Sequence, residues 1–199
     1  MSVRVRGRGR RLVGEDHDVR RRTVATWVPD RERGDLAGFR IREALAADAT
    51  SIANLRSNRS GKPFGEVLGE TRREIAAIDP GTLMLHVATI DGDFAGFGRC
   101  KHVEPADGDC AESVPAGWYL SGIIVAPAHR RRGVGRAITE SRLSWIAERA
   151  REVYYFADTD NLASIHLHAG FGFVEVVHEF EFRKDGTSPT PMSLFVRQL

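Results

Sequence analysis

The residues best suited to do chemistry lie together in one segment near the middle of the 199-residue chain. A continuously apolar run, Ile123-Ile124-Val125, predicts the end of a strand that is buried on both faces. Pro127 prevents the ladder of hydrogen bonds from continuing. Gly133 and Gly135 then stand at the start of a predicted helix, after three successive arginines. The segment therefore predicts a buried strand that leads through an arginine-rich turn into a helix.

A turn of this composition is suited to hold a diphosphate. The first turn of a helix has N–H groups without partners and carries a partial positive charge. Glycines let the main chain come within hydrogen-bonding distance of phosphate oxygens, and arginines add charge-assisted hydrogen bonds. The residues predicted to form this diphosphate cradle are Arg130, Arg131, Arg132, Gly133, Val134, Gly135 and Arg136.

The elements that position the cradle can be predicted from periodicity and from breaking residues. Strands are expected at 39–42, 83–90, 94–102, 118–125, 153–156, 173–182 and 192–196, and helices at 48–58, 66–78, 133–150 and 161–169. Asp91-Gly92 suits a tight hairpin turn. On helix 133–150, the predicted buried face consists of Val134, Ile138, Ser141 and Trp145. This order predicts an α/β fold with a mixed, largely antiparallel central sheet and helices on both faces.

Two motifs resemble those of the GCN5-related N-acetyltransferase (GNAT) family. The family's pyrophosphate signature, Q/R-x-x-G-x-G/A, is matched by Arg130, Gly133 and Gly135. Its second landmark, N-x-x-A/S followed by Y-x-x-x-G-F, is matched by Asn161, Ser164, His168, Gly172 and Phe173, with the histidine in place of the tyrosine. The resemblance covers roughly residue 39 to the C-terminus and implies a GNAT-like acyl-CoA N-acyltransferase fold.

The resemblance also implies an enzyme that uses acetyl-CoA as co-substrate and no metal, in which an amine attacks the thioester directly. The strand before the cradle is then expected to splay from the strand at 153–156, with the pantetheine arm in the gap. By this resemblance, the further cofactor-binding residues are Ile123, Ile124, Val125, Asn161 and Ser164. Asn161 could also serve as a simple N-cap of its helix.

Residues for proton transfer are less well defined. In the family a tyrosine can protonate the departing thiolate, and His168 stands at that position, where it could act as the acid or merely pack. His166 and His168 do not predict a metal site, because residues two apart on a helix point to nearly opposite sides. Many relatives carry an acidic residue on the strand before the cradle, but Ser121 and Gly122 occupy this stretch. The candidates for the base are Tyr119, Glu104, Glu112 and His102, which the sequence does not rank.

Charge divides the chain into two parts. Up to Gly34 there are ten arginines against five carboxylates, a charge of +5, which leaves −3 for the rest of a chain of net charge +2. We expect residues 1–36 to form an arginine-rich, disordered leader, with a basic nucleic-acid arm as the alternative, and residues 37–199 to form the acetyltransferase domain. No apolar run suits a membrane span or a secretory signal. Cys100 and Cys110 are expected to stay reduced, as in a cytoplasmic protein.

The acceptor is expected to be a small-molecule amine, and a cationic one such as an antibiotic would suit the mildly acidic domain. Acidic side chains in the loops at 57–70 and 104–112 would favour such an acceptor. A peptide or protein amine is the alternative within the same chemistry, and a non-catalytic CoA-binding module is a further one because the strand carboxylate is missing. No membrane or nucleic-acid partner is expected, and the protein is expected to be a monomer or a homodimer.

Overall fold

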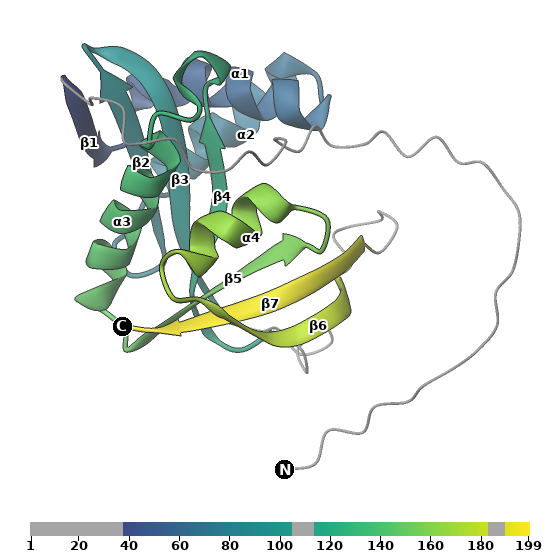
Figure 1. Ribbon diagram of the computed structural model, residues 1–199. Helices are drawn as coiled ribbons and strands as arrows, with labels where there is room; N and C mark the ends of the chain where they lie inside the picture. The colour runs from purple at the N-terminus through teal and green to yellow at the C-terminus, as the bar shows by residue number, and fades with distance from the viewer. Residues whose placement is uncertain (1–37, 105–113, 183–189) are drawn as a thin grey trace, which may run out of the picture.

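One seven-stranded sheet with helices on both faces forms the body of the protein (Figure 1). The computed structural model describes residues 38–104, 114–182 and 190–199. The strands are β1 (Phe39–Glu43), β2 (Leu83–Ile90), β3 (Asp93–Val103), β4 (Gly117–Val125), β5 (Glu152–Asp158), β6 (Val174–Phe182) and β7 (Thr190–Gln198). Their order across the sheet is β1-β2-β3-β4-β5-β7-β6, and only β4 and β5 run parallel to each other. The predicted α/β fold is therefore confirmed.

Four α-helices cover the sheet in the described ranges. They are α1 (Ala49–Ser60), α2 (Phe64–Ala76), α3 (Val134–Ala147) and α4 (Leu162–Ala169). Short 3-10 turns, η1 (Ala46–Asp48) and η2 (Pro127–His129), precede α1 and α3. All four predicted helices are present, with ends that differ by a few residues. None of the helices in this part of the chain is long and apolar enough to cross a membrane.

The β2–β3 hairpin follows the sequence prediction closely. β2 and β3 pair in antiparallel fashion, and Asp91 (φ 52°) and Gly92 (φ 90°) form the tight turn between them. Cys100 on β3 is a buried, free thiol. Cys110 and the predicted leader, residues 1–36, lie outside the described residues.

β4 has two halves with different surroundings. In its paired half, residues 117–120, Trp118, Tyr119 and Leu120 are buried, and Tyr119 pairs with Tyr154 of β5. In its open half, residues 123–125, all three side chains are only half-buried, so the prediction of burial on both faces is wrong. The reason is that no further β4–β5 pair forms among the described residues, and the two strands point apart in Figure 1. The predicted splay between β4 and β5 is thus confirmed.

The buried face of α3 also differs from the prediction beyond its second turn. Val134 and Ile138 are buried as expected, but Ser141 and Trp145 are only partly buried. Ser141 lies beside β2, where its hydroxyl is 2.9 Å from Nδ1 of His86. The buried face continues instead through Arg142, Leu143 and Ile146.

Arg142 is the residue that makes the apolar pattern of α3 misleading. It is only 1% exposed. Its guanidinium donates to the main-chain carbonyl of Arg99 on β3 (3.2 Å) and to the hydroxyl of Thr139 (3.1 Å). A buried cation is tolerated where such acceptors replace water. Because arginine is rarely a core residue, the periodicity of apolar residues favours Ser141 and Trp145 over the face that is in fact buried.

Candidate active site

The predicted diphosphate cradle lies between the open half of β4 and the first turn of α3. α3 begins at Val134, and its N-cap, Gly133, is left-handed (φ 84°), as is Arg131 (φ 60°). Turns that contain left-handed residues can direct successive N–H groups to one concave side, an arrangement that binds anions. No side chain caps α3, so the amides of its first turn have no partner within the helix. Four arginines surround the turn on the exposed surface: Arg130, Arg131, Arg132 and Arg136.

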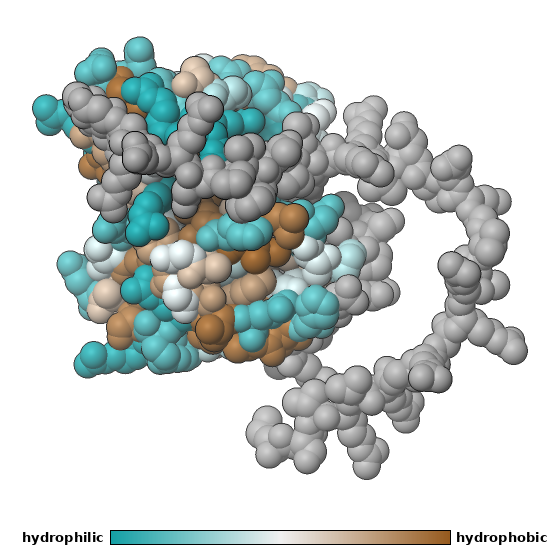
Figure 2. All heavy atoms as spheres, in the orientation of Figure 1, coloured by the Kyte–Doolittle hydropathy of each residue, from teal (hydrophilic) through white to brown (hydrophobic). Residues whose placement is uncertain are grey.

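Three elements converge at the mouth of this cradle. A β-carbon on Gly135 would lie 3.6 Å from Cγ2 of Val125, 3.8 Å from Cδ1 of Ile123 and 3.8 Å from Cδ2 of Leu167. β4, α3 and α4 therefore meet around one glycine. Figure 2 shows apolar side chains gathered over α4 on this face of the molecule. Main-chain donors, arginines and an adjoining apolar surface fit the diphosphate and the pantetheine arm of CoA, although the binding role of each residue stays a prediction.

A β-bulge separates the two halves of β4. Ser121 lies opposite Arg99 of β3, but Ile123 lies opposite Gly98, so Gly122 has no partner in the ladder. Gly122 is left-handed (φ 61°), a conformation that would cost another residue about 1 kcal/mol. Such a bulge bends its strand and increases the twist. The bulge therefore turns the open half of β4 away from β5.

The main-chain groups of the open half face the gap at two residues. The N–H of Ala126 donates to the carbonyl of Ala95 on β3 (2.9 Å). Because main-chain groups alternate in direction along a strand, those of Ile123 and Val125 turn away from β3 and toward the gap. These are the positions predicted to bind the pantetheine arm.

Two arginines donate to the carbonyls that face this gap. The guanidinium of Arg59, at the end of α1, donates to the carbonyl of Ile123 (3.2 Å). Nε of Arg130 donates to the carbonyl of Val125 (3.3 Å). Both ends of the open half are thus held by side chains, which fixes the direction of the N–H groups between them. Arg59 was not predicted from the sequence.

Asn161 and Ser164 lie at the start of α4. Oδ1 of Asn161 accepts a hydrogen bond from the N–H of Ser164 (3.3 Å), so Asn161 serves as the N-cap that the sequence offered as an alternative. A cofactor contact by either residue stays a prediction.

His168 faces the core rather than the gap. It is 2% exposed, and its ring stacks on that of Tyr155 with centroids 4.1 Å apart. Burial, followed by the nearby Arg142 cation, lowers its pKa to about 4. Nδ1–H donates to the carbonyl of Ser164 (2.8 Å), which leaves Nε2 as a buried lone-pair acceptor with no proton to give. This geometry favours the packing role over the acid role, which stays a prediction.

The other predicted proton-transfer residues lie at the paired end of β4. The hydroxyl of Tyr119 donates to the carbonyl of Pro115 (2.7 Å), and burial raises the pKa of this tyrosine. Glu104 is exposed and lies 3.2 Å from His102. Val103, the neighbour of Glu104, lies seven residues along β3 from the partner of Val125, roughly 23 Å. The geometry therefore disfavours Tyr119, Glu104 and His102 as the base, and Glu112 lies outside the described residues.

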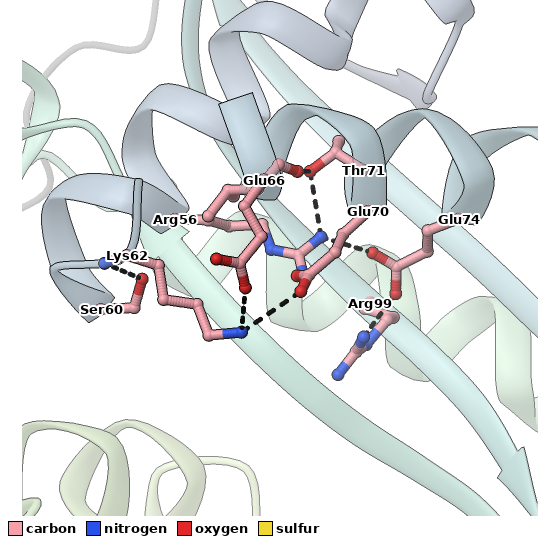
Figure 3. Close-up of polar contacts among 9 residues, drawn as sticks. Arg56, Ser60, Lys62, Glu66, Glu70, Thr71, Glu74 and Arg99 are labelled. Carbon is pink, nitrogen blue, oxygen red and sulfur yellow. Dashed lines mark hydrogen bonds and ion pairs between the residues drawn. The ribbon is translucent and has the colours of Figure 1, made fainter. Parts of the chain in front are cut away.

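A polar network on α2 offers carboxylates in their place, and Arg99 of β3 lies beside it (Figure 3). Glu66, Glu70 and Glu74 follow one another at intervals of four residues along α2. Glu74 pairs with Arg99 and, at 2.8 Å, with Arg56. We call Glu66, Glu70 and Glu74 the α2 carboxylate row.

The row is connected to β4 through one arginine. Nε of Arg99 donates to the hydroxyl of Ser121 (2.9 Å), at the strand position where the sequence lacks the acidic residue of many relatives. The carboxylate that approaches this position through Arg99, Glu74, therefore comes from α2 and not from β4.

The carboxylate row and the bulge could have been predicted from the sequence. Three glutamates four residues apart on a predicted helix must share one face, and a glycine within a predicted strand indicates a bulge. The contact between Arg59 and β4 could not have been predicted, because it joins residues that are distant along the chain. Among the described residues, no three histidine, cysteine, aspartate or glutamate side chains gather so as to hold a metal ion.

Comparison with known proteins identifies the class that this site defines. The model of the acetyltransferase (GNAT) family matches residues 49–173, so the chain belongs to that family. It is an N-acetyltransferase of the kind that uses acetyl-CoA.

Individual relatives resemble the chain over different lengths. The aminoglycoside N(6')-acetyltransferase type 1 of Klebsiella aerogenes is 35% identical over 108 residues, which are 53% of this chain and 67% of that protein. The probable N-acetyltransferase HLS1-like of Arabidopsis thaliana is 38% identical over 53 residues, 26% of this chain and 13% of that protein. The structure of yncA, a putative acetyltransferase from Salmonella typhimurium with its cofactor acetyl-CoA, has a TM-score of 0.59 at 18% identity and covers 81% of this chain and 94% of its own. This last likeness shows the fold alone.

Proposed function

We propose that the protein acetylates a small-molecule amine that carries more than one positive charge. The observation that carries this proposal is the α2 carboxylate row, which Arg99 ties to Ser121 beside the open half of β4. Arg56, Lys62 and Arg99 balance the charge of the row, so it would act on a substrate by direct pairing: an ammonium group that displaces Lys62 gains charge-assisted hydrogen bonds to Glu66 and Glu70. The relative from Klebsiella aerogenes is named for an aminoglycoside, a cationic antibiotic, and supports the same class.

Lys62 illustrates how the row can hold an ammonium group (Figure 3). Its Nζ lies 2.9 Å from Oε1 of Glu66 and 3.2 Å from Oε1 of Glu70. These hydrogen bonds, that to Glu66 first, raise the pKa of the lysine. Its side chain is half exposed, and exposed ion pairs contribute little to stability. A substrate ammonium could therefore take the place of Lys62 without unfolding the site.

The reaction joins the two substrates by direct transfer. The amine nitrogen attacks the thioester carbonyl carbon, the C–N bond forms and the C–S bond breaks. N–H groups of Ile123 or Val125 that face the gap could stabilise the negative charge that develops on the carbonyl oxygen. Holding both substrates at this gap supplies a further part of the acceleration.

A panel of acceptors tests the proposal. The purified protein is incubated with acetyl-CoA and a polyamine, an aminoglycoside, a neutral primary amine or a peptide N-terminus, and products are identified by mass spectrometry. We expect the polycations to give the highest kcat/KM. Higher values for the peptide would favour the alternative acceptor, and CoA binding without any product would favour a non-catalytic module.

The carboxylate row is tested by Glu70→Gln. We expect KM for the polycation to rise about tenfold, since a charge-assisted hydrogen bond is lost, while KM for acetyl-CoA does not change. Glu140→Gln, on the exposed face of α3, is the matched control. An equal effect of both variants would contradict a specific role for the row.

A further inference from the structure

A carboxylate at the end of β5 takes no part in the contacts described so far. Asp158 is the last residue of β5, and its Oδ1 is buried without a hydrogen-bond partner among the described residues. The turn that follows does not depend on this side chain, because the main-chain carbonyl of Asp158 accepts the N–H of Asn161 (2.9 Å). A buried acceptor without a donor costs about 1–3 kcal/mol. A role other than stability would explain why this residue is an aspartate.

The side chain of Asp158 points to the same face of the sheet as Ser121. Met192 lies directly opposite Asp158 on β7, and Phe156 precedes it by two residues; both pack against the buried cluster that contains Tyr119. Cross-strand neighbours and residues two apart share a face. Ser121 follows Tyr119 by two residues before the bulge and contacts Arg99 on that face. Asp158 therefore lies on the face where the α2 carboxylate row approaches.

Asp158 is also level with the open half of β4. Tyr119 and Tyr154 pair across the parallel strands. Four residues further along each strand, roughly 13 Å, lie Ile123 on β4 and Asp158 on β5. The two strands no longer pair at this level. The carboxylate thus stands across the gap from the main-chain groups that would face the thioester.

We propose that Asp158 is the general base of the reaction. As nitrogen bonds to the carbonyl carbon and sulfur departs with the C–S electron pair, the carboxylate takes the proton that the nitrogen loses, directly or through one water. That proton then passes to the thiolate or to solvent, and the products are the N-acetyl amine and CoA. The inference rests on the proposed function only in that the acceptor is an amine.

Asp158→Asn tests this role, with the best acceptor of the panel. A positioned base contributes typically 10²–10⁴-fold, so we expect kcat to fall at least 100-fold. Calorimetry should give a CoA affinity within twofold of the parent, and the variant should be no less stable, because an unpaired carboxylate is removed. The rate deficit should shrink at high pH, where the free amine is already neutral. Asp160→Asn, an exposed aspartate two residues along the chain, is the matched control and should keep parental kcat.

Other outcomes overturn the assignment. An unchanged kcat in Asp158→Asn would exclude the base role, and a raised KM with unchanged kcat would make Asp158 a binding residue only. A deficit that does not depend on pH would point to a structural role, as would an Asp158→Glu variant that recovers no part of the parental activity. Failure of the proposed function is distinguishable, because the parent would then acetylate a peptide and not the polycations, and Asp158→Asn would still slow that reaction.

Discussion

The two halves of β4 belong to one strand but differ in their surroundings and in their predicted roles. The paired half is buried between β3 and β5 and belongs to the core, whereas the open half has β3 on one side and the gap on the other. The residues matched to the cofactor motif follow the open half, while Tyr119 and Glu104 lie toward the paired end and His168 packs on Tyr155 behind it. The difference teaches that the bulge at Gly122 marks the boundary between structural and chemical parts of the strand.

The largest effect on CoA binding is expected in the diphosphate cradle, which follows the open half. Gly133→Glu places an anion at the first turn of α3, where phosphate oxygens would bind, and should lower CoA affinity about 100-fold or more by calorimetry. Gly133→Ala is the control, since it shares the left-handed strain of about 1 kcal/mol but adds no charge. Similar affinities for the two variants would remove the cradle from the site.

An intermediate effect is expected from two buried histidines, His168 behind the paired half and His86 on β2, whose pKa values burial lowers to about 4. In the unfolded chain a histidine has a pKa near 6.5, so above that pH both states are neutral and stability is complete. As pH falls from about 6.5 toward 4, the unfolded state alone binds the proton, and each histidine lowers the unfolding free energy by about 1.4 kcal/mol per pH unit.

His168→Phe should therefore roughly halve this loss on the acid side, because His86 still titrates. Urea titrations at several pH values would measure it. Turnover at neutral pH should change little, since the ring stacks on Tyr155 and has no proton at Nε2. If the variant instead turned over at least 100-fold more slowly with normal CoA binding, His168 would be restored as the acid and the distinction between the two halves would weaken.

The smallest effect is expected within the paired half itself. Tyr119→Phe removes the hydrogen bond to the Pro115 carbonyl and should cost about 1 kcal/mol of stability with kcat unchanged. Tyr155→Phe is the matched control, because the hydroxyl of Tyr155 is buried without a partner among the described residues and its removal should cost nothing. A collapse of turnover in Tyr119→Phe alone would instead identify this tyrosine as the base.

The sequence by itself determined the elements and the cofactor motif. Strand and helix patterns, the Asp91-Gly92 turn and the Arg130 to Gly135 signature depend on residues close together in the chain, and local sterics and main-chain hydrogen bonding fix them. Prediction from the sequence failed where a residue type lies in an unusual environment, as Arg142 does in the core.

Only the tertiary structure decided which polar residues meet. Arg59 reaches Ile123, Glu74 reaches Arg99, and Asp158 stands across the gap from the open half, because strands and helices far apart in sequence are brought to one edge of the sheet. No local pattern encodes which of these residues meet, since that depends on the register of the strands and on the bulge at Gly122. For the same reason His168, matched by its motif position, turned out to face the core.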